Sequence, residues 1–301
     1  MFKKHFEEVY GSIKLIDVEE RFDIYFSRFF GLYFAKIGRF YGVTPTHVSL
    51  ASLFFGVIGG ALFYFQNSLG IVALGSFLVV LAGVLDSSDG QLARMTGQST
   101  DLGRVIDGVI DNFVFVAAYL GGSLYFLESY GWWIFALVVA AGWTQSLKSA
   151  LYEFYKSEYL QLVGKTTSGN IPLSADMVEP GGDKWYHKFL HVVYKDYTAK
   201  QLRNTTRTPE WRERAQKYSM DANSKNEFDR KYRALNKPLF TWWALVCGTN
   251  THRTAAIVFV MMSRFDLFLW TSTIWTLALI PISISQKRRD KKLMETFEET
   301  T

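Results

Sequence analysis

The feature that most constrains this chain is the gathering of its apolar residues into long blocks. The sequence has 301 residues, of which 49% are hydrophobic, and most charged residues lie between the apolar blocks rather than within them. A helix needs about 20 mostly apolar residues to cross the hydrocarbon core of a bilayer. The pattern is typical of helical membrane proteins, so we predict an all-α, polytopic membrane helical bundle.

We predict six transmembrane helices. They cover approximately residues 48–65, 70–85, 105–127, 132–151, 254–262 and 267–284. The fifth segment is short for a span, and an earlier start near Phe240 would lengthen it. Before the first span, residues 21–40 interleave Arg and Lys with Phe, Tyr, Leu and Ile. This favours an N-terminal amphipathic helix lying in the membrane interface, and a seventh, tilted span is the alternative.

The placement of Lys and Arg predicts the orientation. With six spans, both termini lie on the side that holds most of the basic residues. The three short connections on the other side, 66–68, 127–131 and 263–266, carry one basic residue, Arg264. The positive-inside rule therefore places the termini in the cytoplasm. The short outer loops, and an N-terminus without the apolar core of a signal peptide, favour a bacterial inner membrane, with the endoplasmic reticulum as the alternative.

The spans divide the chain into five parts. These are an N-terminal cytoplasmic segment with the interfacial helix (1–45), transmembrane helices 1–4 (46–155), a cytoplasmic basic insertion (156–237), transmembrane helices 5–6 (238–286) and a charged cytoplasmic tail (287–301). The insertion has sixteen Lys and Arg residues against ten Asp and Glu residues. Two interpretations stay open for it: a solvated segment on anionic headgroups, or a lid over an active site. No nucleic-acid motif accompanies the basic balance, so we expect membrane lipid and no nucleic acid as a partner.

Four carboxylates stand at the ends of two apolar segments, in 86-DSSDGQLARMTGQSTDLGRVIDGVID-111. Asp86 and Asp89 are three residues apart, Asp107 and Asp111 are four apart, and both spacings put a pair on one face of a helix. If the two helix ends meet, four anions converge and repel one another. Divalent cations such as Mg²⁺ or Mn²⁺ relieve that repulsion, and two metals flanked by carboxylates recur at sites of displacement at phosphorus.

Small residues and a cation accompany these acids. Gly90 follows Asp89, and Gly103 lies one turn before Asp107, where a missing side chain lets a ligand approach the backbone. We place Arg94 in the loop between the two helices, as a fixed cation suited to phosphate. These residues predict a bound pyrophosphate. An ion pathway is the alternative, although transporters usually place such sites near the bilayer midplane.

The same stretch resembles the signature of the class I CDP-alcohol phosphotransferase (CDP-alcohol phosphatidyltransferase) family. That signature reads D-x2-D-G-x2-A-R-x8-G-x3-D-x3-D, and the chain matches all its fixed positions with Asp86, Asp89, Gly90, Ala93, Arg94, Gly103, Asp107 and Asp111. The predicted interfacial helix and six spans agree with the family as well. The chain departs from it over residues 156–237 and at Thr46, where the family usually has Asn, so no role is carried over to Thr46.

The resemblance implies an enzyme that moves a substituted phosphate from a CDP-linked lipid donor to an alcohol acceptor and releases CMP. It implies that Asp86, Asp89, Asp107 and Asp111 bind two Mg²⁺ or Mn²⁺ ions and that Asp111 is the general base. It also implies a homodimer. The residues implied to hold the CDP moiety are Asp89, Gly90, Ala93, Arg94 and Gly103.

The acceptor is less determined. The expected reaction joins CDP-diacylglycerol to inositol, inositol phosphate, glycerol phosphate or serine, and the alternative joins a soluble CDP-alcohol to diacylglycerol or a ceramide-like hydroxyl. Lys148 and Arg253 lie near the ends of spans four and five and would bind an acceptor phosphate, or else reach lipid phosphates by snorkelling. A divalent-cation transporter and a non-catalytic scaffold are the alternatives of other classes.

Overall fold

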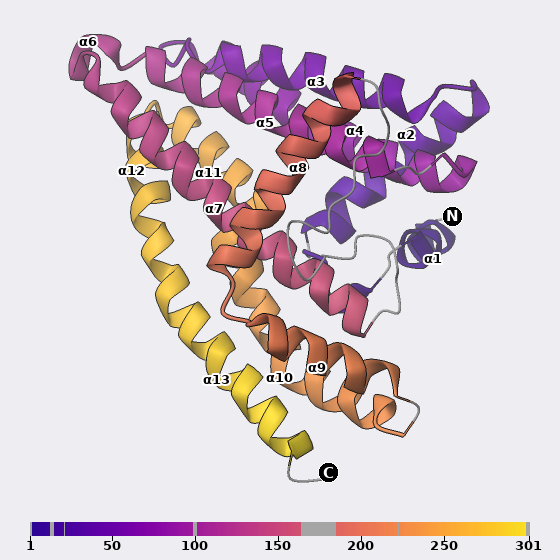
Figure 1. Cartoon of the computed structure of the whole chain (residues 1–301). Coiled ribbons are helices and arrows are strands. Elements are labelled where there is room, and N and C mark those ends of the chain that lie inside the picture. The colour runs from indigo at the N-terminus through magenta and orange to yellow at the C-terminus, as the bar shows by residue number, and fades with distance from the viewer. Residues whose placement is uncertain are drawn as a thin grey trace. The chain divides into compact units, whose positions relative to one another are not determined.

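The computed structural model describes residues 2–12, 15–20, 22–98, 101–163, 185–221 and 223–298, without the side chains of 101–109 and of a few other helical residues. Every regular element within these ranges is a helix and none is a strand, which confirms the predicted all-α class (Figure 1). The chain forms two compact units. Unit 1 contains residues 1–13, 20–144 and 252–274, and unit 2 contains residues 14–19, 145–251 and 275–301.

Four stretches of the described chain are long and apolar enough to cross a membrane. They are Pro45–Leu62, Leu69–Thr96, Trp133–Leu162 and Phe265–Phe297, and they correspond to the first, second, fourth and sixth predicted spans. The third predicted span falls in a helix whose described apolar part, Ile110–Leu124, is shorter. The fifth falls in the 13-residue helix Thr249–Met261. Six spans therefore remain a prediction.

Unit 1 contains the motif. Its helices are α1 (Phe2–Ser12), the π-helical turn η2 (Asp23–Ser27), α2 (Arg28–Phe40), α3 (Pro45–Leu62), α4 (Leu69–Thr96), α5 (Asp101–Leu124), α6 (Leu127–Tyr130), and parts of α7 (Trp133–Leu162), α11 (Thr249–Met261) and α12 (Phe265–Trp275). Thr44 caps α3 by accepting a hydrogen bond from the His47 N–H, and Pro45 occupies its first turn. Both are favoured at a helix start.

The predicted loop placement of Arg94 is wrong. The α4 helix continues past the predicted span end at Leu85 and past the two acids to Thr96, so Arg94 lies in its last turn. Good helix formers occupy residues 91–94, and Gly97, with φ +69°, ends the helix in the left-handed conformation that suits glycine. The last predicted span is interrupted by the 3₁₀ turn η4 (Thr276–Ala278), where the ring of Pro281 prevents regular α-helical bonding.

Glycines bring the backbone of α3 against both α4 and α5, and the three helices run side by side (Figure 1). A Cβ on Gly59 would lie 2.7 Å from the carbonyl oxygen of Gly75 in α4. A Cβ on Gly60 would lie 2.9 Å from Cα of Ala118 in α5, and one on Gly121 would overlap the Gly60 carbonyl. Small residues permit such close approach between helices in membranes. The crossing fixes how α4 and α5 are placed along α3.

The α2 helix covers α4 beside the motif. Gln91 donates a hydrogen bond from Nε2 to the Arg28 carbonyl oxygen at 3.1 Å, and Ala35 of α2 packs in one cluster with Leu85 and Leu92. The other side of α2 exposes large apolar residues, among them Phe40 at 82% exposure. The helix thus has one packed face and one open apolar face.

The three short connections meet at one end of unit 1. Gln66 donates from Nε2 to the Gly122 carbonyl oxygen at 2.8 Å, and its own backbone carbonyl accepts from the Ser263 hydroxyl at 2.8 Å. Tyr130 donates to Asp266 at 3.0 Å. The helices that these connections join therefore turn back at the same end, which is the arrangement that the predicted topology requires.

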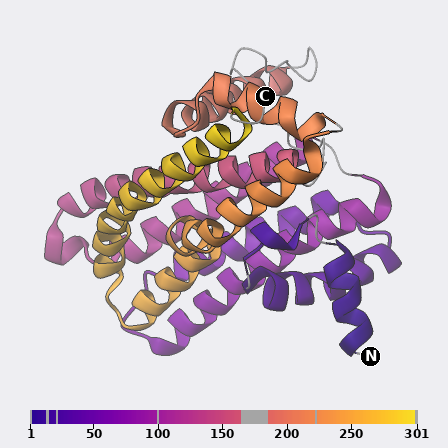
Figure 2. The ribbon, with the colours of Figure 1, turned by 90° about the horizontal axis from the view of Figure 1, so that it is seen from below.

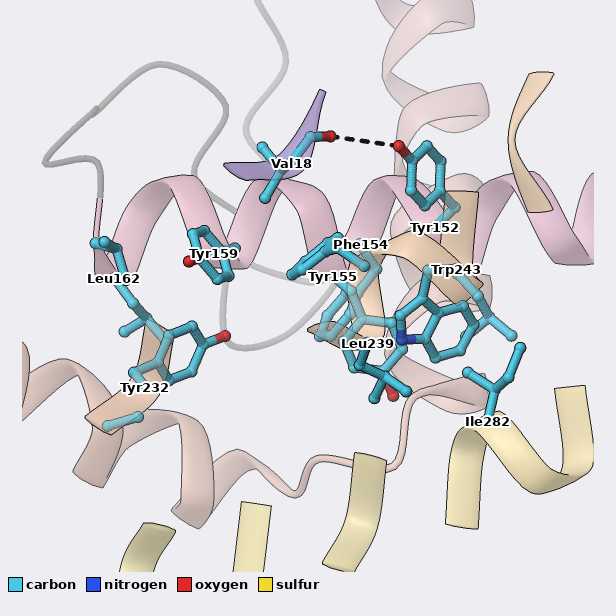
Figure 3. Close-up of a cluster of buried hydrophobic side chains, with 14 of the residues drawn as sticks. Val18, Tyr152, Phe154, Tyr155, Tyr159, Leu162, Tyr232, Leu239, Trp243 and Ile282 are labelled. Atoms are coloured by element: carbon cyan, nitrogen blue, oxygen red, sulfur yellow. Dashed lines mark hydrogen bonds between the residues drawn. The ribbon is translucent and has the colours of Figure 1, made fainter. Parts of the chain in front are cut away.

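Unit 2 consists of η1 (Ile16–Val18), the remainder of α7, α8 (Trp185–Asn204), α9 (Pro209–Met220), α10 (Lys225–Cys247), η4 and α13 (Leu279–Glu298). Figure 2 shows α10 in orange and α13 in yellow on neighbouring paths. Its core is aromatic (Figure 3): the rings of Tyr155 and Trp243 lie 4.6 Å apart, and Tyr152 donates a hydrogen bond to the Val18 carbonyl oxygen.

A buried guanidinium joins the predicted insertion to the C-terminal helix of unit 2. Arg207 donates from Nε and Nη2 to both oxygens of Asp290 in α13, at 3.0 Å each, and from Nη1 to Glu158 and Tyr232. Burial opposes its charge, but Asp290 and Tyr232 outweigh that effect and raise the Arg207 pKa above its usual value. The described part of residues 156–237 thus shares a core with α13, which its composition did not indicate.

Replacing Gly121 tests the close crossing of α3 and α5. We expect Gly121→Ala to lower the free energy of unfolding by about 1–3 kcal/mol, because its methyl group collides with backbone rather than with a flexible side chain. Thermal unfolding in detergent measures the change. Gly142→Ala is the matched control, since a Cβ there meets nothing within 4 Å, and equal unfolding temperatures for the two variants would contradict the crossing.

Replacing Arg207 tests the buried ion network. Arg207→Met leaves Asp290 buried without its guanidinium partner and leaves Glu158 with Arg212 alone, and we expect a loss of about 3–5 kcal/mol in stability. The control is Arg203→Met, which removes an exposed cation from the end of α8. Chemical denaturation followed by tryptophan fluorescence compares them, and an Arg207→Met protein as stable as its control would refute the network's importance.

Candidate functional site

The acids of α4 lie near the cytoplasmic end predicted for that helix. Asp89 is 6% exposed, and Ser49 of α3 donates a hydrogen bond from Oγ to Asp89 Oδ2. Asp86 lies one turn earlier and is half-buried. Both acids stand on an unbroken helix, and this fixes their separation.

Asp111 of α5 lies near the same two acids. It interacts electrostatically with Asp86, and Asp89 interacts with Asp111. Three carboxylates from two helices are therefore within electrostatic range, as expected if the helix ends meet. Like charges repel at such range, and cations nearby would relieve that repulsion.

Two arginines supply positive charge here. Arg94 interacts with Asp89 and lies over Gly90, where a Cβ would stand 3.5 Å from Arg94 Nη1. Arg253 of α11 places Nη2 4.0 Å from Asp111 Oδ1. The guanidinium of Arg253 occupies the space beside Gly83, one turn before Asp86, and a Cβ on Gly83 would overlap it.

A buried polar pair lies next to Arg253. Tyr119 Oη and His252 Nε2 are 2.6 Å apart, and the two residues are 5% and 8% exposed. Tyr119 is two turns beyond Asp111 on α5, on the same face. Thus α11 meets α5 at two neighbouring polar contacts.

Comparison with known families identifies this region. Residues 42–172 match the model of the CDP-alcohol phosphatidyltransferase family, and this range includes α3, α4 and α5 with every motif residue. This part of the chain thus matches a CDP-alcohol phosphatidyltransferase domain. The domain match confirms the family to which the motif pointed.

A second comparison gives a partial relative. The chain is 33% identical over 73 residues to an uncharacterized protein of Aquifex aeolicus (strain VF5). The alignment covers 24% of this chain and 35% of that protein, so the chain spans about a third of the relative's length. No solved structure matches the chain significantly.

The remaining predicted site residues differ in how well the structure describes their positions. Ala93 lies on α4 between Asp89 and Arg94. Gly103 and Asp107 belong to α5, but their side chains lie outside the described residues. Lys148 belongs to unit 2, where it is 1% exposed and interacts with Cys247. The structure therefore brings Arg253 to the described acids of unit 1, whereas Lys148 belongs to the other unit.

Three residues near the acids were missed by sequence reasoning: Ser49, Gly83 and Tyr119. Each contacts a residue that is distant in the sequence, and no local sequence pattern predicts such a contact. Ser49 follows the helix start at Pro45 by one turn, so its sequence position indicates only that it lies near the beginning of α3.

The donor set of the domain is carboxylate oxygen, which fits Mg²⁺ or Mn²⁺. Among the described side chains, no group of three or more His, Cys, Asp or Glu residues is close enough to hold a metal ion. The side chain of Asp107, the fourth acid of the motif, lies outside these described side chains. The electrostatic interaction of Asp111 with Asp86 and Asp89 is the observation that fits a shared cation.

Ser49 offers a test of the acid site itself. We expect Ser49→Ala to destabilise the protein by about 1–2 kcal/mol, because the buried Asp89 loses a hydrogen-bond donor. Ser49→Thr retains a hydroxyl and serves as the control. Thermal unfolding of the wild type and the two variants makes the comparison. The prediction is wrong if the alanine variant unfolds at the same temperature as the wild type.

Proposed function

We propose that the chain is an integral-membrane CDP-alcohol phosphotransferase of phospholipid biosynthesis. It would transfer a phosphatidyl or phospho-alcohol group from a CDP-linked donor to an alcohol and release CMP. The observation that carries the proposal is the complete family motif within the matched domain, combined with the electrostatic interaction of Asp111 with Asp86 and Asp89 from the other helix.

The acids would hold the cations and activate the acceptor. Asp86, Asp89, Asp107 and Asp111 are the proposed ligands of two Mg²⁺ or Mn²⁺ ions, which when bound would neutralise charge on the diphosphate and the departing CMP. Asp111 would accept the proton of the acceptor hydroxyl, since an alcohol is a poor nucleophile at neutral pH. The attacking oxygen then needs to lie in line with the bond to CMP.

The nucleotide would lie along the end of α4. Asp89, Gly90, Ala93 and Arg94 form one continuous helical segment there, and Gly103 would complete the site from α5. Arg94 lies over Gly90, where its guanidinium can reach a phosphate without obstruction by a side chain at residue 90. This role is the one expected from the resemblance to the family.

For the substrates, we favour CDP-diacylglycerol as donor and a small polar alcohol as acceptor, such as inositol, inositol phosphate, glycerol phosphate or serine. The contact between Arg253 and Asp111 supports an acceptor that bears a phosphate, because it sets a cation beside the proposed base. Lys148 stays a sequence-based candidate for the same phosphate. The reverse polarity, a soluble CDP-alcohol with a lipid hydroxyl, is the variant to be tested alongside.

The proposed membrane arrangement has six spans, an interfacial α2 and the site on the cytoplasmic side, in a bacterial inner membrane and as a homodimer. The four apolar stretches support an integral membrane protein. The meeting of the three short connections at one end supports three antiparallel pairs of spans. The open apolar face of α2 supports its position in the interface.

CMP release tests the proposal. Purified protein with Mn²⁺, CDP-diacylglycerol and each acceptor should release CMP, and a second arm should pair soluble CDP-alcohols with diacylglycerol. Asp111→Asn should lower the rate by about a hundredfold or more, because it removes the proposed base. Glu128→Gln is the control, an exposed acid in the short α6.

Absence of CMP with every donor and acceptor would overturn the enzyme assignment. Uptake of Mn²⁺ into proteoliposomes without CMP production would favour a divalent-cation transporter instead. Full activity of Asp111→Asn would leave the reaction in place but exclude Asp111 as its base.

A further inference from the structure

We propose that Gly83 is a positioning residue that holds Arg253 beside Asp111. The missing side chain at residue 83 opens a slot in α4, and the guanidinium of Arg253 fills it. The inference rests on the proposed function only for the role of Asp111, because the slot is a property of the fold.

The slot is defined by steric exclusion. A Cβ on Gly83 would overlap Arg253 Nη1 and would lie 2.8 Å from its Cζ. The backbone on either side is packed, with Ala82 and Val84 at 2% and 5% exposure. Any side chain at residue 83 would therefore displace the guanidinium, which is the flexible partner, rather than move α4.

The other end of Arg253 is fixed as well. His252, the preceding residue, is paired with Tyr119 at 2.6 Å, and its ring lies 4.9 Å from that of Phe268. The pairing fixes the beginning of α11 against α5. The guanidinium is thus directed toward Asp111 by a fixed backbone and by a slot that admits it, and its side chain is only 13% exposed.

A guanidinium held at this place sets the charge around Asp111. It offsets the repulsion among the three described carboxylates, and it presents N–H groups to oxyanions. The same charge opposes a divalent cation at Asp111 and attracts a phosphate ester. Moving it away should tighten metal binding and weaken the binding of an anionic substrate, whereas a glycine that serves only helix packing would affect neither.

The slot is tested by the reactivity of Arg253. Phenylglyoxal modifies accessible arginines, and mass spectrometry of the digested protein reports the modified fraction of Arg253. We expect several-fold faster modification in Gly83→Ala than in the wild type, because the methyl group expels the guanidinium. Gly142→Ala, where a Cβ meets open space, should behave as the wild type. An unchanged rate in Gly83→Ala would overturn the proposal.

The effect of the Arg253 position on metal binding is tested by a double-mutant cycle, in which electron paramagnetic resonance measures Mn²⁺ binding. Gly83→Ala and Arg253→Met should each lower the Mn²⁺ dissociation constant several-fold. If Gly83 acts through Arg253, the double variant should have the same Mn²⁺ dissociation constant as Arg253→Met, because the effects of coupled residues on binding are not additive. Additive effects would refute the positioning role.

These readouts separate this proposal from the enzyme assignment. If no CMP is released but Arg253 reactivity and the double-mutant cycle are as expected, the proposed enzymatic function is wrong and the positioning role of Gly83 stands. If CMP is released but Arg253 reactivity is the same in Gly83→Ala and the wild type, the enzymatic function stands and the positioning role is wrong. If the wild type binds no Mn²⁺, the arginine reactivity alone decides.

Discussion

Backbone contact between α3 and its two neighbours, α4 and α5, is the constraint on which the site depends. Gly59, Gly60 and Gly121 allow the helices to touch without intervening side chains, and each helix then has little freedom to slide along the others. The motif carboxylates are divided between α4 and α5. Their meeting therefore follows from a crossing that lies several turns away from them.

Charge is the second requirement of this site. Carboxylates in apolar helices are costly unless they are compensated, and the described part of the chain supplies Arg94 from the same helix and Arg253 from a distant one. Ser49 adds a hydrogen bond to Asp89. Each of these partners comes from a different position on the fold, so the acids are stabilised only once α3, α4, α5 and α11 are assembled.

The motif is the part of the site that the sequence predicted best. Spacing placed Asp86 and Asp89 on one face, the resemblance to the family implied that Asp111 joins them, and apolar blocks located the helices that carry them. The end of the helix was less predictable, because α4 continues beyond the acids through Arg94 to Thr96 instead of giving way to a loop. Here helix propensity and the glycine at residue 97 outweighed the change in polarity.

Contacts between distant residues were beyond sequence reasoning. Nothing in the local pattern around Gly83 indicates that an arginine 170 positions later fills its space. The same holds for Arg207 and Asp290, which turn a basic, polar segment and a charged tail into one buried network. In each case the partner is set by tertiary packing, whereas composition describes only the average polarity of a segment.

The central claim is that the ends of α4 and α5 form one two-metal site. The most direct measurement is the number of Mn²⁺ ions bound per chain in the presence of CDP, by electron paramagnetic resonance on the wild type and an Asp86→Asn, Asp89→Asn double variant. The account predicts two ions per chain in the wild type and loss of tight binding in the variant. Absence of tight binding in the wild type, or undiminished binding in the variant, would contradict it.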